Sequence, residues 1–567
     1  MPSPMTHARK QRSSLLFGSF GLMLVVACGR VLGTDFDNLY PAQAGAGGAG
    51  MGGGGNAGYG GDNAGYGGTE TGGAGSSSTG GSSTGGSSTG GSSTGGSSAG
   101  ALGEGGVGGG PSCSPDATDF YVNPAAVPGD CEYPTITAAL DAAHLSRANG
   151  RTVHVAEGHY DAVSNEKFPL RVTGGISLVG AGASKTVIEG MDSFATIDDG
   201  GAWGTSANKA TIVTGDKSAV TRIANLRLLS GTQSITQNSS AIFCNRGNGQ
   251  PPGAPRLEPT LIVDGVTFDA QYDQSLAVTN SMMPEASACN VRVISSTFRN
   301  SANGIANNAC GGTDDTDTYS SLEIGDGNAA HANLFDNLAA DGLCAGDAVR
   351  IWGCSSWTSI RGNLFNRGER AVTLAYGGQP DQYVEIIGNT FKSQADGSLQ
   401  VLISAQVDEL SSNQFTLDDA LGFECNVQDV GRPSAAIRLW DYGRNTSPRI
   451  AHARNNSFIG NRVAVRFEGN TEFDPSDFGT VDDPGGNTFS CNSNVDGFGF
   501  DVRQSAHTAA DKRMLFAGNY WDHSIPTLST SESNGLDYWL DSSGPAPLLD
   551  NAKLANTTCP KNFTKGP

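Results

Sequence analysis

Apolar and polar residues alternate over short runs along most of the chain after residue 113. Examples are Val349/Ile351, Val372/Leu374, Val463/Val465/Phe467 and Phe498/Phe500/Val502. A period of two is typical of β-strands, because successive side chains of a strand point to opposite faces. Gly, Asn, Asp and Ser separate the runs, which is typical of turns. The pattern therefore predicts many short strands joined by turns.

A longer repeat runs through the same region. Nine tripeptides end in an aromatic residue and mostly begin with Asn: VTF, STF, NLF, NLF, NTF, NQF, NSF, NTF and NYW. Their aromatic residues are Phe268, Phe298, Phe335, Phe365, Phe391, Phe415, Phe458, Phe489 and Trp521, at spacings of 30, 37, 30, 26, 24, 43, 31 and 32 residues. A repeat of this length made of short strands predicts a β-solenoid, whose coils pair their strands with those of their neighbours.

The recurring Asn has a structural task in such a solenoid. Coils lie about 4.8 Å apart, so equivalent side-chain amides can hydrogen-bond along the stack. Asn also tolerates the left-handed backbone angles of tight turns, and the neighbouring Phe would stack inside. We interpret the Asn-x-Phe array as scaffold and not as a ligand site.

An ordered series of motifs carries a resemblance to a known family. The series comprises DFYVNP at 119–124, YPTITAALDAA at 133–143, TVHVAEGHYD at 152–161, FPLRV at 168–172, ISLVGAG at 176–182 and repeats such as IIGNTF and LFAGNYWD. The repeats resemble the pectin-lyase-like superfamily, and the start resembles a domain of unknown function that opens many secreted bacterial β-helices. This resemblance covers about 450 residues. It implies an all-β fold, a single-stranded right-handed parallel β-helix over 113–567, and it specifies no activity.

Both ends of the solenoid are expected to be covered, because strand edges would otherwise be exposed. Over 113–185 we expect a cap and the first coils, with a helix that begins at Thr135 or Thr137 and ends at Gly150. Its buried face would carry Ile136, Leu140 and Ala143. The segment 525–567 lacks the repeat and is expected to cover the other end.

The N-terminus has the anatomy of a bacterial lipoprotein signal over 1–28. Basic residues precede an apolar stretch, Leu15–Ala27, that is shorter than the roughly 20 residues needed to span a membrane. The stretch ends in Val-Val-Ala-Cys, which resembles a lipobox, so we expect lipidation of Cys28. Ordinary cleavage or an unmodified Cys is the alternative. We expect an exported lipoprotein of the outer membrane or cell surface, with the periplasmic face as the alternative.

Residues 29–112 are expected to form a disordered tether. Of the 81 Gly residues in the chain, 32 fall between 41 and 110, where repeats of GGSST dominate. Such a composition cannot bury a core and behaves as a flexible linker.

Apart from Cys28, ten Cys residues remain, and an even number in an exported chain predicts disulfides. They are Cys113, Cys131, Cys244, Cys289, Cys310, Cys344, Cys354, Cys425, Cys491 and Cys559. Proximity in sequence makes Cys113–Cys131 and Cys344–Cys354 the first candidates. The absence of a C-x-x-C pair disfavours a zinc site.

The charge balance restricts which classes of partner the chain can bind. The chain has 35 Lys and Arg against 56 Asp and Glu, a formal net charge of −21. Nucleic acid is excluded as a partner, because counterion displacement requires many basic residues. Repulsion also disfavours anionic glycans unless arginines or bound Ca²⁺ reverse the local field. A neutral polysaccharide or a surface protein is the easier partner.

The best candidate site lies on the outer face of the predicted strands. If Val349/Ile351, Ile437/Leu439 and Val465/Phe467 point inward, then Arg350, Arg438 and Arg466 point outward in a row. We take Arg350, Arg438 and Asp347 as catalytic candidates. The ligand-binding candidates are Arg466, Trp352, Trp357, Trp440 and Tyr376. The alternative is that these are solvated Arg and Trp residues packed against side loops.

A metal site has a weaker basis, and no cofactor is required by the sequence. Asp314, Asp315 and Asp317 offer the hard oxygen ligands that Ca²⁺ prefers, although a solvated acidic turn explains them as well. The enzyme motifs of the superfamily are not met. The pattern Arg-x-Pro-x-x-Arg is replaced by Arg432-Pro433 with the next Arg at 438, and Gly-His-Gly is missing.

The sequence thus favours an envelope-anchored module for binding, adhesion or structural display, with carbohydrate as the leading ligand class. The alternative is a polysaccharide lyase or glycoside hydrolase that acts on the outer strand face. Either enzyme would need titratable groups on the outer face of adjacent coils that converge on one sugar.

Overall fold

The structure is a computed structural model whose described part covers most of the chain after residue 112. The described residues are 113–125, 131–190, 209–215, 219–230, 239–244, 258–269, 274–278, 289–308, 320–338, 346–352, 355–375, 382–416, 435–441, 447–469, 472–492, 500–508, 512–523, 526–530, 536–540, 544–557 and 559. The expected signal segment with Cys28 and the expected tether 29–112 lie outside them. Within these ranges, no helix is both long and apolar enough to cross a bilayer.

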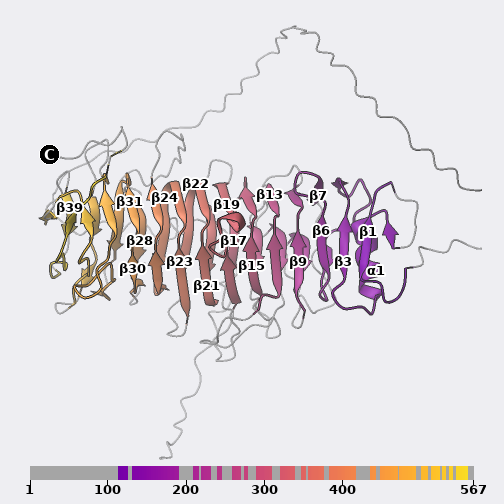
Figure 1. Cartoon of the computed structure of the whole chain (residues 1–567), viewed down its shortest axis with the longest axis horizontal. Coiled ribbons are helices and arrows are strands. Elements are labelled where there is room, and N and C mark those ends of the chain that lie inside the picture. The colour runs from indigo at the N-terminus through magenta and orange to yellow at the C-terminus, as the bar shows by residue number, and fades with distance from the viewer. Residues whose placement is uncertain are drawn as a thin grey trace, which may run out of the picture. The chain divides into compact units, whose positions relative to one another are not determined.

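The described chain forms the predicted parallel β-helix. Its strands lie side by side along one axis, with α1 near one end and β39 near the other (Figure 1). Coils of the solenoid place short strands in three rows, and each strand pairs in parallel with its equivalent on the next coil.

The first row is a 12-stranded sheet. Its strands are β1 (Asp119–Val122), β2 (Glu132–Tyr133), β3 (Thr152–Val155), β6 (Ser177–Gly180), β9 (Thr221–Ala224), β12 (Leu261–Asp264), β15 (Asn290–Ile294), β18 (Ser320–Ile324), β21 (Ser355–Arg361), β23 (Tyr383–Ile387), β26 (Glu409–Ser411) and β30 (Ala453–Arg454).

The second and third rows form one 24-stranded sheet, because β22 (Leu364–Ala375) and β24 (Thr390–Leu402) run through both. The second row also holds β4 (Gly158–Tyr160), β7 (Thr186–Gly190), β10 (Arg227–Ser230), β13 (Thr267–Asp269), β16 (Thr297–Arg299), β19 (Leu334–Leu338), β27 (Gln414–Thr416), β31 (Ser457–Ile459), β34 (Thr488–Ser490), β37 (Tyr520–Trp521) and β40 (Lys553–Leu554). The third row holds β5 (Leu170–Val172), β8 (Lys209–Thr214), β11 (Ser239–Cys244), β14 (Gln274–Val278), β17 (Asn303–Asn308), β20 (Asp347–Trp352), β28 (Ala435–Trp440), β32 (Val463–Glu468), β35 (Phe500–Gln504), β38 (Leu528–Ser529) and β39 (Leu536–Leu540).

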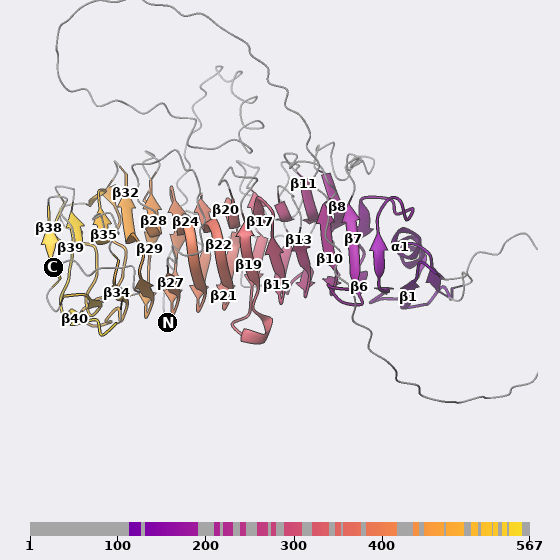
Figure 2. The ribbon, with the colours of Figure 1, turned by 90° about the horizontal axis from the view of Figure 1, so that it is seen from above.

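Five smaller elements accompany the rows. Two short pairs, β25 (Gln406–Val407) with β29 (Arg449–Ile450) and β33 (Glu472–Phe473) with β36 (His507–Thr508), lie outside the long sheets. The 3-10 helix η3 (Ala329–His331) projects from the coil between β18 and β19 (Figure 2).

The predicted ladder of Asn side chains is confirmed. It consists of Asn333, Asn363, Asn389, Asn413, Asn456, Asn487 and Asn519, and each side-chain amide donates to the Oδ1 of the next at 2.9–3.1 Å. All seven are buried. The amides also donate to main-chain carbonyls, as Asn413 does to Ile386 at 2.8 Å. The ladder therefore ties each turn to its neighbours by hydrogen bonds that are shielded from water.

The left-handed turn residue is not the ladder Asn, contrary to our expectation. At six of the seven ladder positions, the positive φ value belongs to the residue just before the Asn, as at Gly362, Gly388, Gly486 and Ser412, whereas Ala332 before Asn333 has a φ of −60°. Gly is the residue that adopts this conformation without a steric penalty. The ladder Asn therefore does not need a left-handed backbone, and its side-chain amide points inward to its hydrogen-bond partners.

The aromatic residues stack inside the solenoid, as predicted. From Phe268 to Phe489 the ring centroids of successive coils lie 4.6–5.0 Å apart with nearly parallel planes. Trp521 continues the stack 4.6 Å beyond Phe489. Burial of these rings is a large part of the hydrophobic stabilisation of the coils.

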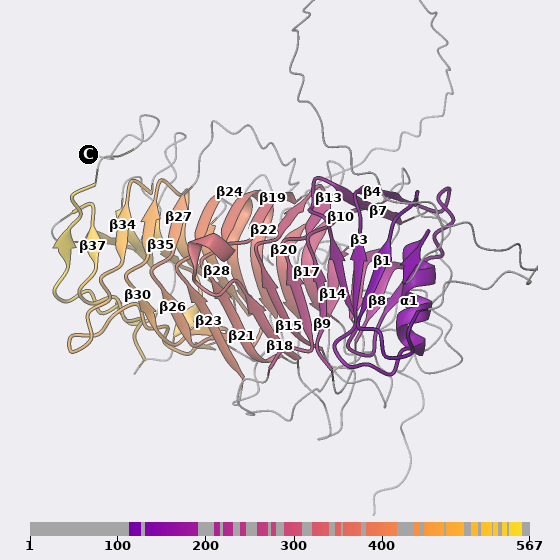
Figure 3. The same ribbon diagram turned by 45° about the vertical axis from the view of Figure 1, so that its right-hand side comes forward.

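The predicted capping helix is α1 (Ile136–Leu145), which covers the first coils (Figure 3). Thr135 caps it by accepting a hydrogen bond from the Ala138 N–H at 3.1 Å. Ile136, Ala139, Leu140 and Ala143 form its buried face. The helix ends at Leu145 and not at Gly150, because the extended backbone of Ser146 terminates it.

Three disulfides lie in the described part of the chain. Cys113–Cys131 is the pair expected from proximity, and it is confirmed. Cys244–Cys289 and Cys491–Cys559 complete the described bridges. The remaining four, Cys310, Cys344, Cys354 and Cys425, lie outside the described residues.

Candidate functional site

The three arginines predicted to form a row occupy equivalent positions of the third strand row. Register partners run from Arg350 through Thr373, Gln400 and Arg438 to Arg466. At about 4.8 Å per coil, Arg438 and Arg466 are immediate neighbours, whereas Arg350 lies roughly 14 Å from Arg438. The row therefore divides into two clusters on the same sheet.

The first cluster surrounds Asp347. Arg370 Nε lies 2.8 Å from Asp347 Oδ1, Arg350 Nε lies 3.8 Å from Oδ2, and the Thr373 hydroxyl donates to Oδ1 at 2.6 Å. Ala348 and Val349 both belong to the core, so the alternation is interrupted at the start of the strand. This interruption brings Asp347 and Arg350, which are three residues apart, to the same side.

The second cluster surrounds Glu468. Arg438 Nε donates to Glu468 Oε2 at 2.6 Å, and Arg466 pairs with the other carboxylate oxygen. The guanidinium carbon of Arg438 also lies 4.3 Å from the ring centroid of Trp440, which is cation–π geometry. Two guanidinium groups thus share one carboxylate beside an indole ring.

Trp352 and Trp440 frame an apolar strip between the clusters. They share one register position, with Ala375 and Leu402 on the two coils between them. Both indoles are half-buried and pack against Ala375, Leu402 and Ile403. We call the combined surface the arginine–tryptophan face, and it is made of Asp347, Arg350, Trp352, Arg370, Arg438, Trp440, Arg466 and Glu468.

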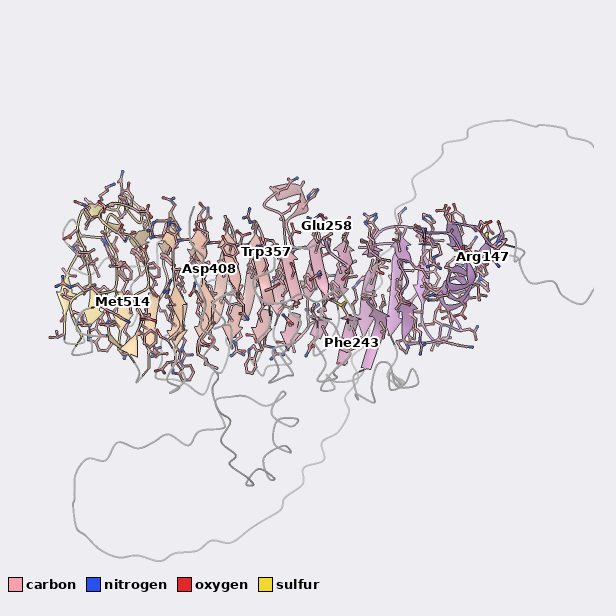
Figure 4. All side chains as sticks on the ribbon, turned by 90° about the horizontal axis from the view of Figure 1, so that it is seen from below. Arg147, Phe243, Glu258, Trp357, Asp408 and Met514 are labelled. Atoms are coloured by element: carbon pink, nitrogen blue, oxygen red, sulfur yellow. A yellow bond between two sulfur atoms is a disulfide. The ribbon has the colours of Figure 1, made fainter. Side chains whose placement is uncertain are left out.

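Trp357 is not part of this face, contrary to our expectation. It lies in β21 of the 12-stranded sheet, where its register partner is Tyr383. Figure 4 places Trp357 and Asp408 along one side of the solenoid. Arg361 on the same strand forms a two-pronged ion pair with Glu385 at 2.6 and 2.8 Å.

Electrostatics on the 12-stranded sheet follow from these contacts. The hydrogen bond to Glu385 raises the pKa of the Arg361 guanidinium. Burial raises the pKa of Tyr383, and the negative charge of Glu385 adds to the effect. Both groups therefore keep their protons at neutral pH, so neither Arg361 nor Tyr383 serves as a general base there.

The remaining predicted site residues lie outside the described residues. These are Tyr376 and the Ca²⁺ candidates Asp314, Asp315 and Asp317. Within the described ranges, no three His, Cys, Asp or Glu side chains converge as metal ligands. A Ca²⁺ site at 314–317 stays a prediction.

Sequence reasoning missed several members of the site. Arg370 and Glu468 complete the two clusters, and Arg503 extends the arginine row with its guanidinium 4.1 Å from the Trp539 ring centroid. The same period-two rule would have found Arg503, one position after Val502. Arg370 could not be predicted from alternation alone. Its place beside Asp347 depends on the irregular start of β20, which only the strand register shows.

Comparisons with known proteins place the chain in a family. The model described as "Protein of unknown function (DUF1565)" matches residues 126–528. No curated protein matches. Among solved structures, the Azotobacter vinelandii mannuronan C-5 epimerase AlgE6 A-module matches with 15% identity and a TM-score of 0.34, over 75% of this chain and 95% of that one. At this TM-score, nothing about the site follows from the match.

Proposed function

The chain belongs to the DUF1565 family of proteins of unknown function, and from its site we propose that it is a carbohydrate-binding module of the cell envelope. The arginine–tryptophan face is the proposed binding surface. The alignment of two indole rings with two arginine clusters on a single sheet supports this proposal most directly.

The chemistry of the face suits a sugar chain. Indole rings are flat apolar surfaces with a polar edge, and they can stack on the C–H face of a pyranose ring. The guanidinium groups of Arg350 and Arg370 are partly exposed and offer N–H donors in fixed directions, which suit hydroxyl and ring oxygens. Arg438 and Arg466 are buried, and Arg438 packs against the Trp440 ring. Trp352 and Trp440 lie three coils apart, roughly 14 Å, so a ligand that contacts both must extend along the solenoid axis.

The charge arrangement favours a neutral glycan over an acidic one. Asp347 and Glu468 already pair with the guanidinium groups beside them. The chain as a whole carries a formal charge of −21, which repels polyanions at a distance. A neutral polysaccharide avoids this repulsion and still finds hydrogen-bond donors.

Catalysis has less support than binding. A lyase needs a group that accepts a proton, but Arg350, Arg370 and Arg438 are each paired with a carboxylate, and a guanidinium group offers donors and no acceptor. Asp347 is nearly fully buried and is bound by Arg370 and Thr373, so it is poorly placed to act as acid or base on a sugar. The lyase or hydrolase hypothesis is therefore the second candidate.

Attachment to the envelope rests on sequence and on the disulfides. Three described disulfides are typical of proteins that fold in an oxidising compartment. Lipidation of Cys28 would then hold the tethered solenoid at a membrane. Metabolic labelling with a fatty acid should mark the full chain and not a Cys28→Ser variant. Equal labelling of both would contradict the anchor.

A binding panel tests the proposed surface. Purified protein is titrated with neutral and acidic polysaccharides, with and without Ca²⁺, while unsaturated and reducing-end products are followed. We expect binding to a neutral glycan without products, and loss of affinity in Arg438→Ala. Products that disappear in Arg350→Ala or Arg438→Ala would instead establish a lyase or hydrolase. An unchanged affinity in Arg438→Ala would contradict the proposed surface.

A further inference from the structure

Two carboxyl groups lie side by side in the interior of the last coils. Asp501 lies between Phe500 and Val502 on β35, and Asp537 lies between Leu536 and Tyr538 on β39. The register pairs Phe500 with Leu536 and Val502 with Tyr538, so the two Asp residues face each other on adjacent coils. Asp501 is 3% exposed and Asp537 is 1% exposed.

Preceding coils carry small apolar residues at the same position. Ala464 precedes Val465 on β32, and Ala436 precedes Ile437 on β28, at the places that correspond to Asp501. Both Ala residues belong to the hydrophobic core. The chain thus replaces core methyl groups by two adjacent carboxyl groups, an arrangement that repulsion would disrupt if both were ionised.

The hydrogen bonds of the two carboxyl groups indicate which of them holds the shared proton. Asp537 accepts from the Thr527 N–H at 2.7 Å and from the Thr527 hydroxyl at 3.0 Å, and His523 Nδ1 lies 3.0 Å away. Asp501 accepts from the Asn492 side-chain amide at 2.8 Å and is hydrogen-bonded to Asp537. Asp537 accepts more hydrogen bonds than Asp501, so Asp501 is the group expected to hold the shared proton.

The charged surroundings favour the same assignment. Burial raises the pKa of Asp501 well above its ordinary value, and the negative charges of Asp537 and Asp522 raise it further. Asp522 accepts from the Ser490 hydroxyl at 2.8 Å and from the Cys491 N–H at 2.7 Å. Among the described side chains, Asp522, Asp537 and His523 are the titratable groups of this cluster.

We infer that a proton shared between Asp501 and Asp537 holds β38 and β39 on β35, and that its loss at higher pH loosens this end of the solenoid. Two buried carboxylates in contact would repel each other, and separation of β39 from β35 relieves that repulsion. The inference concerns a pH-operated latch in the fold, apart from the proposed glycan surface.

The direction of the pH dependence follows from proton linkage. When β39 is docked on β35, Asp501 keeps its proton at pH values at which Asp501 has lost its proton in the undocked state. Docking is therefore most stable in acid and weakens as the pH rises through the raised pKa of Asp501. Release of one proton changes the opening equilibrium by at most about tenfold per pH unit.

Hydrogen exchange of the β39 amides in the full chain tests the latch. Opening constants are measured between pH 5 and pH 9 and corrected for the intrinsic pH dependence of exchange. We expect opening of the wild type to rise with pH by up to about tenfold per unit, and opening of Asp501→Asn to stay level. The matched control, Asp474→Asn, removes an exposed carboxylate paired with Lys512 and should follow the wild type. A level wild-type profile, or equal slopes in wild type and Asp501→Asn, would overturn the inference.

Two further measurements cover the case in which Asp501→Asn does not fold. Asp501→Ala restores the methyl group that Ala464 has one coil earlier, and its β39 opening should also be independent of pH. The wild type itself should show the infrared carbonyl band of a buried, protonated carboxylic acid at a pH above the ordinary pKa of Asp, and Asp501→Ala should lack this band. Absence of the band from the wild type, or a pH-dependent opening of Asp501→Ala, would contradict the shared proton.

Discussion

At the scale of single residues, the Asn ladder explains why one amide recurs on most coils. Asn413 accepts hydrogen bonds from the main-chain and side-chain N–H groups of Asn389 at 2.9 and 3.1 Å. Its own amide donates to Asn456 and to the Ile386 carbonyl at 3.0 and 2.8 Å. A shorter or apolar side chain would leave these buried groups without partners.

Removal of one ladder residue should therefore be costly. We expect Asn413→Ala to lower the free energy of unfolding by about 2–3 kcal/mol, since buried polar groups of Asn389 and Ile386 lose their partners. Urea unfolding followed by circular dichroism measures the change. Gln414→Ala, at the exposed neighbouring position, is the matched control and should change stability by less than about 0.5 kcal/mol. Equal losses in both variants would contradict the role of the ladder.

Residue-level prediction from sequence succeeded where the repeat itself carried the information. The stacked Asn and Phe positions recur in a fixed motif, so their common surroundings could be inferred from any one copy. Asp501 and Asp537 could not be found in this way, because each occurs once at a position that is Ala464 or Ala436 on earlier coils. Only the register brings the two acids together.

At the scale of elements, helix α1 depends on a residue that is distant in sequence. Glu166 is buried and accepts from the Ile136 and Thr137 N–H groups at 2.6 and 2.9 Å, and from the Thr137 hydroxyl at 2.8 Å. These are N–H groups of the first turn, which have no partner within the helix. A negative charge at this end also suits the helix dipole.

We expect Glu166→Ala to destabilise the cap by about 2 kcal/mol, because two main-chain donors at the helix start lose their acceptor. The readout is faster hydrogen exchange of the α1 amides together with a lower melting temperature. Glu157→Ala removes an exposed carboxylate nearby and serves as the control. If α1 exchanges at the same rate in wild type and Glu166→Ala, Glu166 does not hold the helix.

The aromatic stack leads to a second prediction at this scale. Phe391 is fully buried, and its ring centroid lies 4.8 Å from that of Phe365 and 4.7 Å from that of Phe415. Phe391→Ala should cost about 3–5 kcal/mol, because it leaves a cavity between two rings. Phe391→Leu fills most of that space and should cost less, about 1–2 kcal/mol. Comparison of their urea midpoints checks the order, and an equal cost would argue against tight packing of the stack.

Element boundaries were predicted less well than element types. Residue type and position predicted Thr135 or Thr137 as the cap, and Thr135 is the cap, but the helix stops at Leu145, ahead of Gly150. Ser146 ends the helix early, and its hydroxyl donates to the Ala117 carbonyl of the preceding segment at 2.7 Å. Such a tertiary contact is invisible to a local pattern.

At the scale of the whole molecule, the solenoid converts sequence repeats into continuous surfaces. Residues some 23 to 45 positions apart lie on adjacent coils, as Arg350 and Thr373 or Leu178 and Ile223 do. The shared face of Arg350, Arg438 and Arg466 followed from the period of two. The assignment of Trp357 to this face was wrong, because alternation predicts which side chains point outward but not in which of the three strand rows they lie.

The most direct test of the account compares glycan affinity of the full chain with that of two aromatic variants. Trp440→Ala removes an indole from the arginine–tryptophan face, and Tyr383→Ala removes an exposed ring from the 12-stranded sheet. Isothermal titration with a neutral polysaccharide bound by the wild type should show at least a tenfold loss of affinity for Trp440→Ala, about 1.4 kcal/mol, and little change for Tyr383→Ala. Wild-type affinity in Trp440→Ala, or loss only in Tyr383→Ala, would contradict the proposed surface.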